Sequence, residues 1–205
     1  MTQGSFRLLH VGCGQTTSAD LPPPFNQPPW QEIRLDIDPS VAPDIVASIT
    51  DMPMVGDGAV HAVWSAHNLE HLYPHEVQVA LAEFARVLAP DGFAVITVPD
   101  LERVAAAIVE NGLTQPVYVS PAGPIAPIDM MFGHRQSLAE GYLHMAHRTG
   151  FTAASLKDAL SEAGFAVAEV RHGGWALWAV ASRKAEDAGQ CSRLAEGLAQ
   201  ARKNA

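Results

Sequence analysis

The sequence predicts an α/β fold, with a seven-stranded, mostly parallel sheet, helices on both faces and an antiparallel hairpin strand near the C-terminus. Apolar β-type segments alternate with helix-type segments, which favours parallel strands joined by right-handed crossovers. A glycine pair, Gly12 and Gly14, follows the first apolar segment. The last two apolar segments are separated only by His172, Gly173 and Gly174, a spacing typical of a hairpin.

Each predicted strand is a short apolar or alternating segment. The second alternates Ile33, Leu35 and Ile37 with polar residues, as in a half-buried strand. The fifth is almost entirely apolar, as expected of a central parallel strand. We therefore expect the strands at residues 6–11, 32–37, 44–49, 59–66, 93–98, 165–171 and 175–181.

Two segments have clear helical character. Residues 153–163 can be capped by Thr152 and ended by Gly164. Residues 74–88 carry one apolar face at helical spacing, made of Val77, Ala80, Leu81, Phe84 and Leu88. Further helices are expected at 101–110 and, as a polar and alanine-rich terminal helix, at 183–205. Residues 21–30 contain five prolines and residues 114–127 contain four, so both segments are expected to be loops.

Composition limits the class of protein and its partners. A chain of 205 residues suits a single domain, residues 1–205, in which 101–150 form a lid or substrate-binding insertion. The formal net charge is −9, and basic residues are not clustered as a nucleic-acid partner would require. No apolar segment is long enough to predict a membrane span. Two cysteines give no disulfide framework, which favours a reduced, cytoplasmic compartment.

The glycine pair and an acidic residue indicate an adenosine-type ligand. Gly12 and Gly14 would let the backbone approach a ligand closely after the first strand. Asp36 ends the second strand, where a carboxylate can accept hydrogen bonds from ribose hydroxyls. A pyrophosphate-binding G-x-G-x-x-G pattern would need glycine at the position of Thr17. The pattern therefore favours a nucleoside over a dinucleotide.

Four segments together resemble the successive motifs of class I, Rossmann-like S-adenosylmethionine-dependent methyltransferases, of the methyltransferase type 11 kind. They are Leu9-His10-Val11-Gly12-Cys13-Gly14, Leu35-Asp36-Ile37-Asp38, Ser65-Ala66-His67-Asn68-Leu69-Glu70-His71-Leu72 and Arg86-Val87-Leu88-Ala89-Pro90-Asp91-Gly92-Phe93. The resemblance covers roughly residues 5–182, in the same order. Residues 131–134 and 147–151 are also similar to segments of a bacterial subgroup of predicted methyltransferases.

The resemblance implies a site for S-adenosylmethionine, with S-adenosylhomocysteine as the product. The glycines would contact the methionine and ribose portion, Asp36 the ribose hydroxyls and Ile37 the adenine. Either Ser48 or Asp51 would meet the adenine edge. The full implied cofactor set is His10, Gly12, Cys13, Gly14, Asp36, Ile37, Asp38, Ser48, Ile49, Asp51, Ser65, Ala66 and His67. His10 and Thr16 replace residues common in the family at their positions.

His67 is the candidate catalytic residue, because the resemblance puts it beside the transferred methyl group, where it could act as a general base. Residues 67–71 also match H-x-x-E-H, a zinc-peptidase pattern. The pattern begins directly after a strand, where a helix has scarcely started. We therefore expect no metal, and expect Glu70 and His71 to stabilise the loop by hydrogen bonds. His134, His144 and His147 are expected to lie in the lid.

The predicted function is methyl transfer to a small-molecule or saccharide-like acceptor. One alternative is a non-catalytic relative that binds the cofactor or acts as an accessory subunit. A nicotinamide-dependent oxidoreductase is a weaker alternative, because Thr17 and the terminal hairpin argue against it. The sequence leaves the oligomeric state open, with a homodimer among the alternatives.

Overall fold

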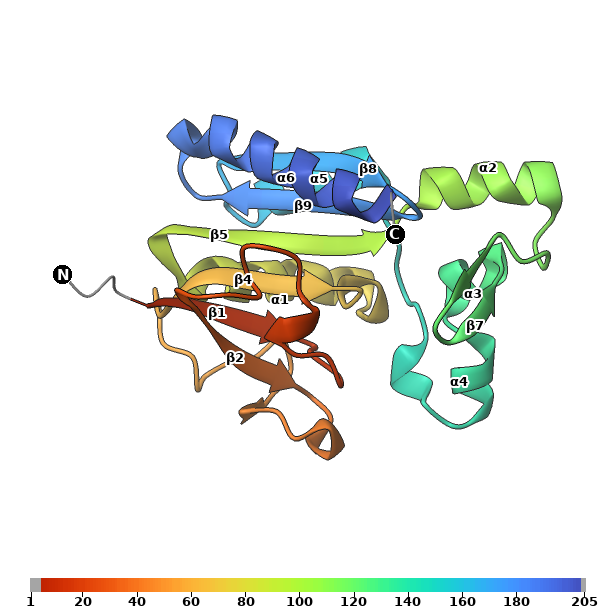
Figure 1. The fold of residues 1–205 in the computed structure, drawn as a ribbon, viewed down its shortest axis with the longest axis horizontal. Coiled ribbons are helices and arrows are strands. Elements are labelled where there is room, and N and C mark those ends of the chain that lie inside the picture. The colour runs from red at the N-terminus through yellow and green to blue at the C-terminus, as the bar shows by residue number, and fades with distance from the viewer. Residues whose placement is uncertain (1–4, 204–205) are drawn as a thin grey trace.

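A computed structural model describes residues 5–203. Its main sheet has the strand order β3-β2-β1-β4-β5-β9-β8, and only β9 runs antiparallel to its neighbours (Figure 1). The predicted seven-stranded sheet with one antiparallel strand is therefore confirmed. The strands are β1 (Phe6–Val11), β2 (Trp30–Asp36), β3 (Ile45–Val46), β4 (Val60–Ala66), β5 (Leu88–Pro99), β8 (Val167–Gly173) and β9 (Ala176–Ser182).

One face of the sheet is covered by α1 (Pro74–Val87) and α5 (Ala153–Glu162). The predicted apolar face of α1 is buried there, against Leu9 and Val63 of the sheet. Leu88, expected to end this helix, instead has an extended backbone and pairs with Val60 as the first residue of β5. The register of β4 and β5 shifts just after this pair, because Ala62 pairs with Phe93.

The opposite face is covered by α6 (Ala188–Lys203) and by the proline-rich loop between β1 and β2. Leu21 and Phe25 of this loop are buried against Leu8 and Trp64, which point away from the first face because side chains alternate along a strand. No α-helix occurs among residues 12–29; only the turn η1 (Ser18–Asp20) does. The prolines thus replace a crossover helix with a packed loop.

The terminal helix differs from its prediction in two ways. It begins at Ala188 rather than near residue 183, after the turn η5 (Ala185–Asp187). It is also not polar all round, because Cys191, Ala195 and Leu198 are buried against β8 and β9. Small residues let the helix lie close to the sheet. Residues 204–205 of the predicted helix lie outside the described residues.

Residues 101–150 lie at the end of the sheet to which the parallel strands point (Figure 1). They begin with α2 (Leu101–Asn111), close to its predicted range. The segment expected to be a loop contains a hairpin, in which Pro124 pairs with Val119. Both strands of this two-stranded ribbon are edge strands, where proline is tolerated. The remaining elements are β6 (Tyr118–Ser120), β7 (Gly123–Ile125), α3 (Pro127–Phe132), α4 (Arg135–Ala139) and η4 (Leu143–Met145).

The edge strand β3 is shorter than the predicted 44–49. After Val46 the chain turns, with Ser48 bridging to Asp51. A short edge strand limits unwanted pairing with other chains. No helix in the described part of the chain is long and apolar enough to cross a membrane.

Candidate functional site

A cavity of about 750 Å³ lies where the carboxyl ends of the central strands meet residues 101–150. The sheet side contributes His10, Gly12, Ala66 and His67 from the predicted site. The opposite side is lined by Tyr118, Ile125, Asp129, Met130, His134, Met145 and His147. Parallel strands place their loops at one edge, so residues distant in sequence converge here.

The bend after β1 requires glycine for two different reasons. Gly12 has φ +57°, and a Cβ there would lie 1.8 Å from Oδ1 of Asn68. The Asn68 Nδ2 donates to the carbonyl of Val11 at 2.9 Å, which fixes this close contact. Gly14 has φ +52°, but a Cβ there would meet nothing within 4 Å. The outer side of the bend at Gly14 is therefore open space.

Asp36 connects β2 to this bend. Its side chain accepts hydrogen bonds from the amides of Gly14 at 2.8 Å and Asp38 at 2.9 Å, one on each oxygen. Arg34 supports the same bend by donating to the carbonyl of Gly14 at 2.6 Å. Asp36 is only 9% exposed. Each of its oxygens keeps a second lone pair for another donor.

The residues expected near the adenine lie outside the cavity, on the β2–β3 side of the bend. Ile37 is 62% exposed, an unusual state for a large apolar side chain. Asp38 caps the turn η2 (Pro39–Val41) by accepting from the amide of Ser40 at 2.8 Å. Ser48 is hydrogen-bonded to Thr50 at 2.7 Å, whereas the side chain of Asp51 is exposed. Ile49 packs at the margin of the core.

Besides Asp36, three residues of the predicted cofactor set are buried: Cys13, Ser65 and His10. Cys13 and Ser65 are buried, so their side chains support the bend from below. His10 is also buried, and its Nδ1 lies 2.7 Å from Oε1 of Glu32. Burial holds the His10 pKa below its ordinary value, although Glu32 opposes this effect. His10 therefore lines the cavity as a neutral ring.

His67 has an unusual backbone. Its φ of +55° is rare for a residue other than glycine, and its amide donates to the carbonyl of Thr97 at 2.9 Å. The ring is 54% exposed, and its Nδ1 lies 3.1 Å from Oε1 of Glu70. Such strain is held by surrounding contacts and is common at active sites.

Glu70 lies in the single turn η3 (Leu69–His71), so the helix that a zinc-peptidase pattern needs is absent there. Burial acts to raise the Glu70 pKa, but the His67 hydrogen bond and nearby histidine charge outweigh it, so the pKa lies below the ordinary value. The carbonyl of Glu70 also accepts from the amides of Arg148 and Thr149. Glu70 thus joins the loop after β4 to the segment before α5, consistent with its expected bonding role.

Several residues of the cavity were not part of the predicted site. Trp175 and Trp178 both line it, although Trp178 is also buried in the core. Tyr118 stacks on Trp175 at a centroid distance of 6.0 Å, and the Arg103 guanidinium lies 4.3 Å from the same indole centroid. His144 does not line the cavity, unlike His134 and His147. Tyr118 and Trp175 lie far apart in the sequence, so no local sequence pattern could have predicted their contact.

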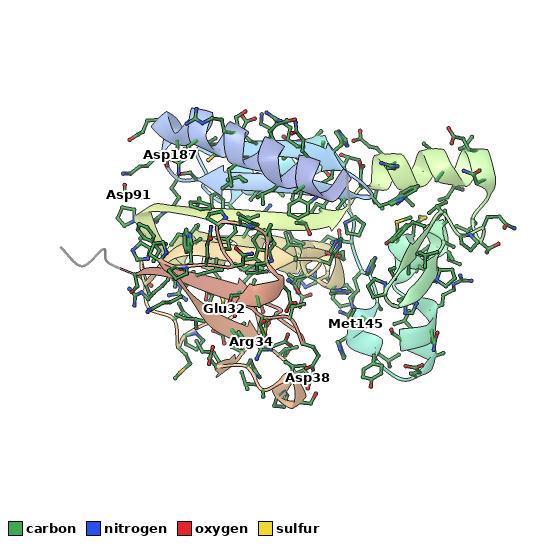
Figure 2. All side chains as sticks on the ribbon, viewed as in Figure 1. Glu32, Arg34, Asp38, Asp91, Met145 and Asp187 are labelled. Carbon is green, nitrogen blue, oxygen red and sulfur yellow. The ribbon has the colours of Figure 1, made fainter. Side chains whose placement is uncertain are left out.

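Ion pairs hold the outer segments in place. In Figure 2, Met145 lies in the outer segment, at the end of the sheet opposite to Asp91 and Asp187. Within residues 101–150, Arg135 pairs with the buried Asp129 at 2.7 Å, which links α3 to α4. The Arg135 hydrogen bonds hold the Asp129 pKa below its ordinary value against the opposing effect of burial. Asp129 lines the cavity as a paired carboxylate.

Comparison with known proteins identifies the domain. The family model described as "Methyltransferase domain" matches residues 9–96. No curated protein sequence gives a significant match. The matched region contains the glycine bend, Asp36 and the loop after β4.

Solved structures share the fold at low identity. PH0226 from Pyrococcus horikoshii is similar over 89% of this chain and 84% of its own, with 13% identity and a TM-score of 0.60. The 1,6-didemethyltoxoflavin-N1-methyltransferase of Burkholderia thailandensis, solved with its substrate and S-adenosylhomocysteine, is similar over 87% and 71%, with 15% identity and a TM-score of 0.54.

The CMeT domain of the citrinin polyketide synthase is similar over 88% of this chain but only 47% of its own, with 16% identity and a TM-score of 0.58. This chain thus spans about half of that relative. The shared fold and the matching domain agree with the strand order found here. Residues 9–96 therefore match a methyltransferase domain, and the described part of the chain shares its fold with solved S-adenosylmethionine-dependent methyltransferases.

Proposed function

We propose that this chain methylates a small-molecule or saccharide-like acceptor. The acceptor would bind in the cavity beneath residues 101–150. One observation carries the proposal: the cavity separates His67, expected beside the methyl group, from the aromatic and histidine side chains of the outer segment. Its volume of about 750 Å³ suits a small molecule, since such sites measure ~300–1,000 Å³. Residues 101–150 then act as the lid.

The residues after β1 and β2 fit the nucleoside part of the cofactor. The outer side of Gly14 is open, so a ribose can approach the backbone there. The Asp36 carboxylate keeps lone pairs for the ribose hydroxyls while it holds the bend, and the exposed Ile37 offers an apolar surface for adenine. When bound, S-adenosylmethionine supplies an electrophilic methyl group on a sulfonium sulfur.

The chain's own contribution is to position the acceptor, exclude water and move one proton. Alignment of two reactants can account for roughly 7–11 kcal/mol of a barrier. We assign His67 as the base. His67 would accept the proton of the acceptor's hydroxyl or amine group, so that the oxygen or nitrogen could attack the methyl group that S-adenosylmethionine would supply, with the electron pair of the carbon–sulfur bond left on its sulfur. The partly exposed ring of His67 can then release the proton to solvent.

Calorimetry with S-adenosylhomocysteine tests the cofactor assignment. We expect wild-type protein to bind it and NAD to show no binding. Asp36→Ala should weaken binding at least tenfold, equivalent to ~1.4 kcal/mol, and Asp36→Asn should lose less because one oxygen remains. Asp91→Ala, an exposed change in β5 far along the strand from its carboxyl end, is the matched control. Wild-type affinity in Asp36→Ala would reject the assignment.

A panel of small hydroxyl- and amine-bearing molecules tests the acceptor class. The readout is the release of S-adenosylhomocysteine from S-adenosylmethionine. We expect at least one small acceptor to be turned over. Cofactor binding without turnover on any acceptor would instead favour the non-catalytic accessory role.

A further inference from the structure

One oxygen of the buried Glu70 carboxylate has no hydrogen-bond partner among the described residues. The side chain is 1% exposed, and its Oε1 lies 3.1 Å from Nδ1 of His67. Its Oε2 is buried, and no hydrogen-bond partner for it exists among residues 5–203. Buried carboxylate oxygens are normally bonded, because removing them from water is costly. This oxygen therefore needs a partner from outside the chain.

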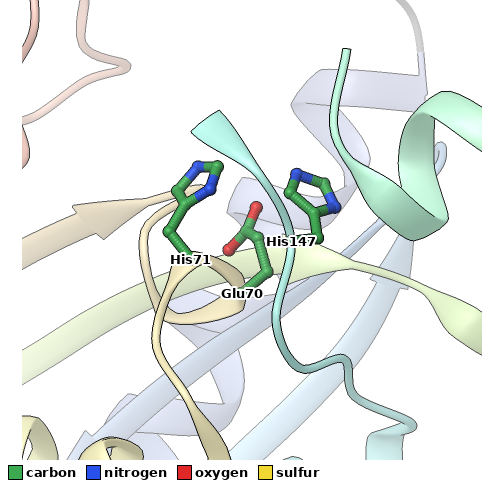
Figure 3. A group of neighbouring side chains, drawn as sticks. All are labelled: Glu70, His71 and His147. Atoms are coloured by element: carbon green, nitrogen blue, oxygen red, sulfur yellow. The ribbon is translucent and has the colours of Figure 1, made fainter. Parts of the chain in front are cut away.

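Two histidines lie beside that carboxylate. Figure 3 shows Glu70 between the rings of His71 and His147, which come from η3 and from the segment before α5. One ligand atom from each of the three residues lies within 4.8 Å of the other two. Ligands around a tetrahedral ion with bonds of ~2.1 Å lie about 3.4 Å apart. Small side-chain rotations would bring the three ligand atoms from within 4.8 Å of one another to the spacing of about 3.4 Å that an ion requires.

The hydrogen bonds of the two rings leave a nitrogen free on each. Nδ1 of His71 lies 3.3 Å from the carbonyl of Ala146, and Nδ1 of His147 lies 2.8 Å from the carbonyl of Met130. A carbonyl only accepts, so each Nδ1 carries the hydrogen and each neutral ring keeps its lone pair on Nε2. Metal-binding histidines are typically oriented by such a bond from the second ring nitrogen.

The charge of the cluster also favours a cation. In the forms that bind metals, an ionised carboxylate and two neutral imidazoles, the cluster would carry one negative charge. Among the described residues Glu70 pairs only with His67, and no lysine or arginine contacts its carboxylate. Two imidazoles and a carboxylate form a donor set that suits Zn²⁺ and related transition-metal ions better than Mg²⁺.

We propose that Glu70, His71 and His147 bind a divalent transition-metal ion, preferentially Zn²⁺. All three residues line the cavity, so an ion held by three protein ligands has a fourth position open to a ligand there. The ion would hold an acceptor oxygen or nitrogen and lower its pKa, a role that rests on the proposed function.

This site differs from the peptidase-type site that H-x-x-E-H suggests. That site would use His67 and His71 on one helical face, whereas His67 here contacts the carboxylate and His147 completes the set. A second cluster, Asp100, Glu102 and His172, carries no such proposal. Both oxygens of Asp100 already accept hydrogen bonds, from the α2 amides and from His172.

Metal titration of the full chain tests the site directly. Protein stripped with a chelator would be titrated with Zn²⁺ by calorimetry, and with Co²⁺ by visible absorption. We expect one equivalent of Zn²⁺ and absorption bands typical of low-coordinate Co²⁺, with no displacement by Mg²⁺. Even outer-shell changes weaken metal binding ~10–100-fold. We therefore expect Glu70→Gln and His147→Ala to weaken it at least about 100-fold.

His75→Ala is the matched control, because His75 is an exposed histidine that stacks on Tyr73. It should bind Zn²⁺ like wild type. No binding by wild type, or unchanged binding by Glu70→Gln and His147→Ala, would overturn the proposal. Should the variants fail to fold, anomalous diffraction at the zinc edge from wild-type crystals decides: a peak between the three residues supports the site, and its absence refutes it.

Binding of S-adenosylhomocysteine to the same samples separates this inference from the proposed function. Stripped protein that binds S-adenosylhomocysteine but no Zn²⁺ rejects the metal site alone. Protein that binds one Zn²⁺ but no S-adenosylhomocysteine supports the metal site and rejects the cofactor assignment.

Discussion

At the scale of single residues, His67 shows how backbone geometry directs a side chain into the cavity. Its left-handed conformation reverses the chain immediately after β4, so Glu70 lies under its ring. An ordinary extended residue there would continue the strand. Asparagine tolerates the left-handed region better than most residues, which provides a conservative substitution.

We predict that His67→Asn lowers turnover by ~10²–10⁴-fold, because a positioned base typically contributes that much. The readout is S-adenosylhomocysteine release with the fastest acceptor of the panel, across a range of pH. The affinity for S-adenosylhomocysteine and the thermal midpoint should stay close to wild type. Undiminished turnover at all pH values would exclude His67 as the base.

The two glycines of the bend should respond differently to alanine. Gly12→Ala places a Cβ against Asn68 and adds left-handed strain, so we expect a loss of about 2–4 kcal/mol in the free energy of unfolding. Gly14→Ala meets no atom, so it should lose only ~1–2 kcal/mol but fill space needed by the ribose. Urea unfolding and S-adenosylhomocysteine calorimetry separate the two effects, and equal stability losses would contradict this distinction.

Local patterns allowed some of these residues to be identified from sequence. Gly12 and Gly14 come just after β1, and Asp36 ends β2, so their positions at the sheet edge could be predicted. The contact of Asn68 with Gly12 and the approach of His147 to Glu70 depend on tertiary packing between distant segments. No spacing in the sequence encodes such contacts, so they could not be predicted.

At the scale of elements, Arg86 and Glu83 of the helix α1 bind the connection between β3 and β4 by hydrogen bonds. Arg86 donates to both oxygens of Glu83, at 2.5 and 2.7 Å, and to the carbonyls of Val55 and Met52. The amide of Met52 donates to Glu83 at 2.8 Å. Residues 47–59 contain no helix, so this network holds that connection.

Glu83 should make the protein sensitive to acid. The hydrogen bonds from Arg86 hold the Glu83 pKa below its ordinary value. Its contribution to stability is therefore full above the unfolded-state pKa of ~4.3 and is lost as the pH falls through the lower folded-state pKa. Glu83→Gln should cost about 1–3 kcal/mol at pH 7 and flatten the acid limb of the stability curve.

The free energy of unfolding in urea would be measured from about pH 3 to pH 7, roughly the range over which carboxylates titrate. Glu110→Gln, an exposed change on α2, is the control and should shift stability by less than ~0.5 kcal/mol. An acid limb as steep in Glu83→Gln as in wild type would show that other carboxylates dominate.

Elements differed in how well sequence predicted them. The α1 face followed from its periodicity, because one stripe of residues must face the sheet. The hairpin β6–β7 was missed because prolines suggested only loop. The buried side of α6 was missed because alanine and cysteine are weak markers of burial, although small residues pack well against a sheet.

At the scale of the whole molecule, a mostly parallel sheet with one antiparallel strand followed from general rules, since alternating elements imply right-handed crossovers and the final hairpin reverses one strand. The position of residues 101–150 over the sheet edge did not, because it depends on contacts such as Tyr118 with Trp175. The cavity is formed jointly by the sheet and this segment. Ligand binding should therefore stabilise the molecule as a unit.

We predict that S-adenosylhomocysteine at 100 times its dissociation constant adds ~2.7 kcal/mol to the free energy of unfolding. For a chain of this size, each kcal/mol raises the thermal midpoint by ~2–4 °C. The expected rise is thus about 5–11 °C by calorimetric or fluorescence melting. NAD at the same concentration should have no effect. A rise with NAD alone would favour an oxidoreductase instead.

The placement of the indoles gives the protein a built-in optical reporter. Of its four tryptophans, Trp64, Trp175 and Trp178 line the cavity, while Trp30 packs against Phe25 beneath the proline-rich loop. Indole emission depends on the polarity of its surroundings. A guest molecule would change the surroundings of these three indoles and leave the fourth as constant background. Intrinsic emission can therefore follow occupancy in real time, without a dye and before any turnover occurs.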